Sequence, residues 1–277
     1  MKKHIAILIH GQIRNNILGN GNNTQFIDTF KQSFLNEELL NKYNVNIFLT
    51  TDNACPIKLQ DYFGSYLKSY LCLDKENIKE PLDIQKYIDK YMYFYNYRKE
   101  NRVKYPYETA PRAEQLHGMY KRYCSYYLMK EYEIEKDIKH EFIVSIRPDE
   151  YFTQSINHLI QLLEQDKHLL VQNDYAYIGR RDIMSHYLNV IFDYGKYMYN
   201  DIIHPDEFID MLSRSPYKYR FLAQKIWPCW LESPEVQIFE HILAYVYNNN
   251  IKASELGYIG ELCQLVSNRK ENVTLTI

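Results

Sequence analysis

Asp149 and Glu150 are the residues whose types and spacing most clearly suggest chemistry. They follow Phe142–Ile146, an apolar run that is typical of a strand buried on both faces. Pro148 has no N–H group to donate and restricts the residue before it to extended backbone, so the strand is expected to end there. Ligands of open α/β sheets bind beyond the carboxyl ends of the strands. Two adjacent carboxylates in that place predict a Mg²⁺ or Mn²⁺ site or an acid/base pair. The alternative is that Asp149 pairs with Arg147 or caps the turn.

Polar residues also follow two expected strands near the amino terminus. They are Gln12, Arg14, Thr51 and Asp52. A guanidinium group can bind phosphate with two parallel hydrogen bonds, and a carboxylate or amide can bind a base edge or a ribose hydroxyl. These four residues are therefore predicted to bind a nucleotide, and ordinary solvated loops are the alternative interpretation.

Three further residues are candidates for catalysis. Arg180 and Arg181 precede an expected helix start, a place that favours anions, and are predicted to contact a phosphate. Glu235 lies in the first turn of another expected helix and is a candidate general base for a sugar hydroxyl. A favourable interaction with the helix dipole also accounts for a carboxylate at that position.

Alternating strands and amphipathic helices must position these residues. Short apolar runs predict strands at residues 5–9, 45–49, 70–73, 142–146, 168–172 and 175–178. Apolar residues at three- and four-residue spacing predict helices from Thr24, at 83–95, at 116–128, after Ser155, at 183–192 with Asp182 as N-cap, near 205, and from Pro234 to 248. This order predicts an α/β fold with a mostly parallel central sheet flanked by helices. We expect one domain over residues 1–277, with a nucleotide-binding half at 1–150 and a helical acceptor-side half at 151–277.

Composition excludes several classes of protein. A formal charge of -2 argues against nucleic-acid binding by phosphate neutralisation. The five cysteines are widely spaced, which argues against structural zinc or a disulfide framework. No run approaches the length of a membrane span, so we expect no transmembrane segment. Dinucleotide, P-loop, nucleophile-elbow and HExxH motifs are absent from the sequence. These features predict a cytoplasmic protein, located in the host cytoplasm if it is viral.

The order of these segments resembles small glycosyltransferases of the GT-A type from bacterial surface-polysaccharide loci and large DNA viruses. The matching segments are Ile7–Arg14, Asn46–Asp52, the helix from Gln115 to Glu133 leading into Ile143–Asp149, and Tyr177–Met184. The resemblance implies a GT-A-like fold and makes Asp149 the counterpart of the metal-binding aspartate of the Asp-x-Asp motif. No Asp-x-Asp occurs in the sequence, and Ser145 stands where a second arginine is expected.

These observations lead to one main hypothesis and two alternatives. The main hypothesis is a hexosyl- or pentosyltransferase that moves a sugar from a nucleoside diphosphate sugar to a hydroxyl of a glycan or glycoconjugate, with Mn²⁺ or Mg²⁺ on the diphosphate. One alternative is a non-catalytic glycan- or nucleotide-binding protein on a degenerate transferase fold. The other is a sugar nucleotidyltransferase, although no Gly-rich phosphate loop follows the first strand.

Overall fold

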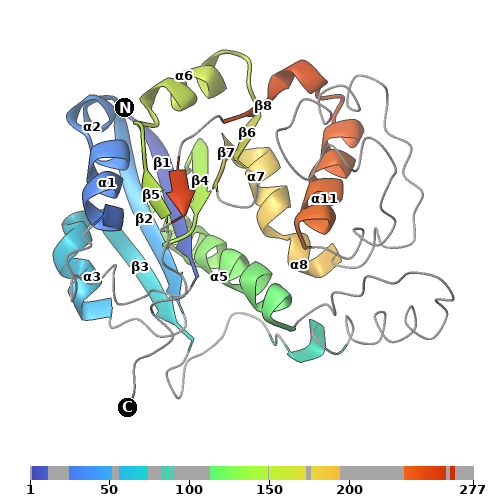
Figure 1. Cartoon of the computed structure of the whole chain (residues 1–277), viewed down its shortest axis with the longest axis horizontal. Helices are drawn as coiled ribbons and strands as arrows, with labels where there is room; N and C mark the ends of the chain where they lie inside the picture. The colour runs from blue at the N-terminus through green and yellow to red at the C-terminus, as the bar shows by residue number, and fades with distance from the viewer. Residues whose placement is uncertain are drawn as a thin grey trace, which may run out of the picture.

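A seven-stranded sheet with helices on both faces forms the centre of the computed structural model (Figure 1). The model describes residues 2–11, 25–51, 56–73, 83, 85–87, 89, 113–148, 150–172, 176–193, 234–259 and 263–265. The strands are β1 (Lys3–His10), β2 (Tyr43–Thr51), β3 (Leu67–Cys72), β4 (Phe142–Ile146), β6 (Leu169–Gln172), β7 (Ala176–Arg180) and β8 (Leu256–Tyr258). A two-stranded sheet pairs β5 (Glu150–Phe152) with β9 (Cys263–Leu265).

The strands of the large sheet lie in the order β3-β2-β1-β4-β7-β6-β8. Strands β3, β2, β1 and β4 are parallel to one another, and β6 is parallel to β8. Strand β7 is antiparallel to both β4 and β6. This arrangement confirms the predicted fold class, an α/β fold with a mostly parallel central sheet.

Alternation along the strands divides the core into two layers. On one face, Ala6 and Leu8 of β1 pack in a cluster with residues of α5 (Ala113–Lys136), α7 (Arg181–Leu188), α8 (Val190–Asp193) and α11 (Pro234–Asn248). On the other face, Ile5, Ile7 and Ile9 pack with residues of α1 (Gln25–Phe34), α2 (Glu37–Lys42), α3 (Pro56–Phe63) and α6 (Asn157–Gln165). Both faces of β1 are therefore buried, as its continuous apolar run predicts.

Several element boundaries differ from the prediction. Arg180 occupies the N-cap position of α7 and Asp182 lies within its first turn, so the prediction that Asp182 is the N-cap is wrong. Strand β3 begins at Leu67, three residues before the expected start. Helices α2 and α3 and strands β5, β8 and β9 were not predicted, because short elements carry too few residues for a clear period. The expected helices at 83–95 and near residue 205 lie largely or wholly outside the described residues.

Candidate active site

Three parallel strands end side by side at what we call the carboxyl edge of the sheet, defined by His10, Thr51 and Ile146. The register pairs His10 with Thr50 and Ile9 with Ile146, so the segments that follow the three strands start next to one another. The predicted ligand residues Gln12, Arg14, Asp52 and Asp149 follow these ends within four residues. These four residues lie outside the described part of the chain.

Thr51 is at the expected place, fully buried as the last residue of β2. Its carbonyl accepts a hydrogen bond from the backbone N–H of Leu73 at 2.8 Å. The hydroxyls of Thr50 and Thr51 are both buried and have no hydrogen-bond partner among the described residues. An unpaired buried hydroxyl costs free energy, which marks both groups as candidate contacts for a bound ligand.

Glu150 lies just beyond the carboxyl edge, as the first residue of β5. Its backbone pairs with Leu265 in the small antiparallel sheet, and its side chain is outside the described part. The prediction that Glu150 assists Asp149 stays a prediction.

Arg180 and Arg181 lie at the opposite end of the sheet, which we call the amino edge. Because β7 is antiparallel to β4, Arg180 pairs with Phe142 at the start of β4 and not with Ile146 at its end. The Nε of Arg180 donates to the carbonyls of Leu163 and Lys167, both at 3.0 Å, near the end of α6. The structure therefore does not bring either arginine together with the residues that follow β1, β2 and β4.

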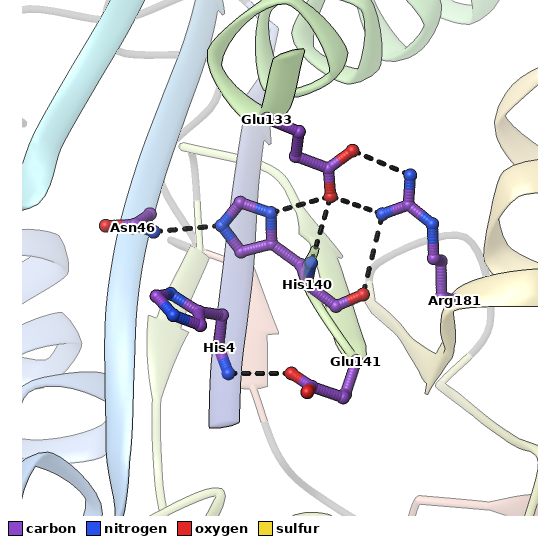
Figure 2. Close-up of polar contacts among 6 residues, drawn as sticks. All are labelled: His4, Asn46, Glu133, His140, Glu141 and Arg181. Atoms are coloured by element: carbon purple, nitrogen blue, oxygen red, sulfur yellow. Dashed lines mark hydrogen bonds and ion pairs between the residues drawn. The ribbon is translucent and has the colours of Figure 1, made fainter. Parts of the chain in front are cut away.

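Arg181 belongs to a buried polar network at the amino edge (Figure 2). Its guanidinium group binds both carboxylate oxygens of Glu133, and the Nη2–Oε2 distance is 2.6 Å. Glu133 also accepts hydrogen bonds from the Nδ1 of His140 at 2.9 Å and from the backbone N–H of His140 at 3.0 Å. On the far side of the imidazole ring, the Nε2 of His140 is 2.9 Å from the Nδ2 of Asn46. The network links α5, α7 and β2 to the segment just before β4, so it stabilises the fold around the start of β4.

The network fixes the charges of its members. Burial raises the pKa of Glu133, but the hydrogen bonds from His140 and Arg181 outweigh it and lower the pKa to about 2. Burial lowers the pKa of His140 below its ordinary value, against the opposite effect of Glu133. The neutral ring donates from Nδ1 to Glu133, so its Nε2 accepts from Asn46. Both ring nitrogens of His140 are thus bonded to residues of the network.

Glu235 is the second residue of α11, and its side chain is outside the described part. Helix α11 leads through Ala253–Glu255 into β8, whose first residue pairs with Leu169 at the amino edge. The start of α11 packs beside α7 and α8, away from that edge (Figure 1). The predicted role of Glu235 as a base stays a prediction.

The structure reveals a buried pair at the carboxyl edge that the sequence reasoning missed. The Nε2 of His10 and the Oγ of Ser145 share a hydrogen bond of 2.8 Å. The residues are 5% and 1% exposed, respectively. One feature of the sequence pointed to this pair. Ser145 is a polar residue inside an apolar strand buried on both faces, and a buried hydroxyl needs a hydrogen-bond partner.

Positive charges gather around this pair. Burial lowers the pKa of His10 well below its ordinary value, and the charges of Arg122, Arg147 and Lys121 lower it further. Helix α5 ends at the amino edge beside His140, so its first half, with Lys121 and Arg122, lies toward the carboxyl edge. The start of a helix also carries partial positive charge. The carboxyl edge is therefore suited to a ligand that carries negative charge.

Within the described ranges, no three side chains of His, Cys, Asp or Glu come together as metal ligands. The predicted ligand Asp149 is not among these residues, and a cation held by one or two carboxylates plus substrate phosphates needs no third protein ligand. Among the helices that the structure describes, none is both apolar and long enough to cross a membrane.

The fold and this edge define an α/β protein with a candidate anion-binding site at the carboxyl ends of parallel strands. No family model matches the chain, and no curated protein matches it significantly. Mouse xyloside xylosyltransferase 1 in its apo form aligns over 94% of this chain and 85% of its own, at 9% identity and a TM-score of 0.32.

Two structures of the glycosyltransferase GlyE from Streptococcus pneumoniae TIGR4 also align. The apo form has 12% identity and a TM-score of 0.31, and the second structure has 10% identity and a TM-score of 0.29. Each alignment covers 91% of this chain and 65% of GlyE, which is less than two thirds of that protein. All three structures are of proteins named as glycosyl- or xylosyltransferases.

Proposed function

We propose that this protein is a glycosyltransferase of the GT-A type that moves a sugar from a nucleoside diphosphate sugar to a hydroxyl of a glycan or glycoconjugate acceptor. The observation that supports this function best is the convergence of three parallel strand ends at one edge. Beyond those ends follow Gln12 and Arg14, Asp52, and Asp149. Such an edge is where open α/β sheets bind ligands.

The roles of these residues follow from their chemistry. Gln12, Arg14, Thr51 and Asp52 would bind the base, the ribose and a phosphate of the donor. Asp149, with Glu150 beside it, would hold Mn²⁺ or Mg²⁺. The cation would neutralise charge on the diphosphate leaving group. Glu235 would act as general base on the acceptor hydroxyl if the reaction inverts the sugar.

The positive charge that stabilises the leaving diphosphate is better sought at the carboxyl edge than at Arg180 or Arg181. Both guanidinium groups make their hydrogen bonds at the amino edge. Lys121, Arg122 and Arg147, by contrast, act electrostatically on His10 at the carboxyl edge. A cation placed where negative charge develops stabilises the transition state, so these three residues replace Arg180 and Arg181 in the proposed mechanism.

Nucleotide release tests this function. The purified chain is incubated with a panel of nucleotide sugars, with and without Mn²⁺, and the nucleoside diphosphate released by transfer or slow hydrolysis is measured. One nucleotide sugar is expected to be consumed, and Asp149→Asn is expected to abolish its consumption because the cation on the diphosphate loses its carboxylate ligand.

Asp137→Asn is the matched control, since it makes the same chemical change at an exposed residue after the end of α5. Asp137 has a positive φ of 50°, which asparagine also tolerates. Full activity in Asp149→Asn would contradict the assignment. Nucleotide binding without any turnover would favour the non-catalytic alternative.

A further inference from the structure

Two contacts join the end of β1 to the end of β4. The first is the hydrogen bond of 2.8 Å between His10 and Ser145. In the sheet register Ser145 pairs with Leu8, so the His10 side chain reaches back by two residues along β4. Ser145 lies four positions before Asp149 in the sequence. The hydrogen bond therefore joins the end of β1 to β4, the strand that Asp149 follows.

The second contact is between Gly11 and Pro148. Gly11 has a φ of +136°, which L side chains rarely adopt, and a Cβ at this position would lie 3.2 Å from the Cδ of Pro148. Its backbone N–H donates to the carbonyl of Thr50 at 3.0 Å, which fixes the turn to β2 as well. Position 11 thus needs a glycine for its backbone and for its closeness to Pro148.

The second contact lies directly before residues with proposed roles. Gly11 precedes Gln12, and Pro148 precedes Asp149. We propose that His10, Gly11, Ser145 and Pro148 form a positioning device that sets the spacing between the nucleotide-binding segment after β1 and Asp149. This inference rests on the proposed function, and it adds residues that position the donor without touching it.

The chemistry of His10 suits this role. Its imidazole is buried and held neutral by burial and by the neighbouring cations. A neutral ring with a fixed partner can hold two strands together without adding or cancelling charge where a diphosphate binds. A carboxylate in its place would pair with Lys121, Arg122 or Arg147 and compete with the donor for them.

Two substitutions remove the contacts separately. Ser145→Ala removes the hydroxyl that binds His10, and Gly11→Ala introduces a methyl group against Pro148. Each is expected to raise the donor KM by about tenfold or more. The acceptor KM is expected to stay within about twofold of the wild-type value, because the substitutions change the spacing of the donor-binding residues only.

The chain offers a matched control for each variant. Asn46→Ala removes the polar partner of the buried His140 at the amino edge, as Ser145→Ala does for His10 at the carboxyl edge. Gly64→Ala places alanine at a positive φ of 53° where a Cβ would meet no atom within 4 Å. Both controls are expected to lower Tm while the donor KM stays within about twofold of wild type.

The experiment measures Tm and steady-state kinetics for all four variants, with the nucleotide sugar that the wild-type chain consumes. If Gly11→Ala does not fold, Ser145→Ala alone decides. A folded Ser145→Ala with an unchanged donor KM would overturn the positioning role, and so would an equal rise in Asn46→Ala. A wild-type chain that neither binds nor consumes any nucleotide sugar would instead contradict the proposed function.

Discussion

Arg181 and Glu133 form a bidentate ion pair at the amino edge of the sheet, and the distance between Nη2 and Oε2 is 2.6 Å (Figure 2). Their side chains are 14% and 6% exposed. The pair lies near the first residue of β4, whereas Asp149 follows the last residue of that strand. Arg181 was predicted from the sequence to contact a phosphate, but in the structure its guanidinium group binds Glu133 and holds α7 against α5.

Removing Arg181 is expected to destabilise the fold without affecting the donor site. Arg181→Met leaves the Glu133 carboxylate buried without its guanidinium partner, and breaking such a pair costs about 3–5 kcal/mol. Urea unfolding measures the loss. Lys3→Met is the control, since it breaks an exposed ion pair with Glu164 that is worth about 0–1 kcal/mol. A small loss of stability in Arg181→Met together with a raised donor KM would contradict this structural role.

Stability is expected to fall on acidification, with Glu133 and His140 as two of the causes. The folded-state pKa of Glu133, about 2, lies below its unfolded value, so its contribution is complete above pH ~4.3 and is lost as pH falls toward the folded value. The pKa of His140 is also lowered, by burial, so its protonation favours the unfolded state as pH falls below ~6.5.

Urea unfolding at a series of pH values between about 7 and 3 measures this dependence. In Glu133→Gln the part of the slope below pH ~4.3 is expected to become shallower, because glutamine does not titrate there. An unchanged slope in that variant would show that other carboxyl groups dominate.

Two glycines are expected to respond to alanine in opposite directions. A Cβ at Gly179 in β7 would lie 2.9 Å from the backbone carbonyl oxygen of His168, so Gly179→Ala is expected to cost about 1–3 kcal/mol. A Cβ at Gly118 in α5 would meet no atom within 4 Å, so Gly118→Ala is expected to gain about 0.5–1 kcal/mol from helix propensity. Thermal unfolding of the two variants checks this, and a loss in both would contradict the packing around α5.

Strand positions were predictable from the sequence, but strand direction was not. Apolar runs located β1, β2 and β4 and correctly placed Thr51 at a strand end. Nothing in the run that forms β7 shows that it is antiparallel to β4. A parallel β7 would have carried Arg180 and Arg181 to the carboxyl edge, and the antiparallel one carries them to the amino edge.

The hydrogen bond between His10 and Ser145 on neighbouring strands could not be predicted from the sequence either. His10 and Ser145 are 135 positions apart, and each alone resembles an isolated polar residue at or near a strand end. Their pairing follows from the order of β1 and β4 in the sheet, which depends on long-range packing. The polarity of Ser145 indicated that a partner exists but could not identify it.

Nucleotide-induced stabilisation tests the central claim most directly. Tm is measured for the wild-type chain and for Asp149→Asn with UDP, GDP, ADP, CDP and dTDP, each with and without Mn²⁺. One nucleotide at about 100 times its Kd is expected to stabilise the wild-type fold by about 2.7 kcal/mol, and each kcal/mol raises Tm by about 2–4 °C. The account predicts that this shift is lost or strongly reduced in Asp149→Asn. No shift with any nucleotide, or an equal shift in Asp149→Asn, would contradict it.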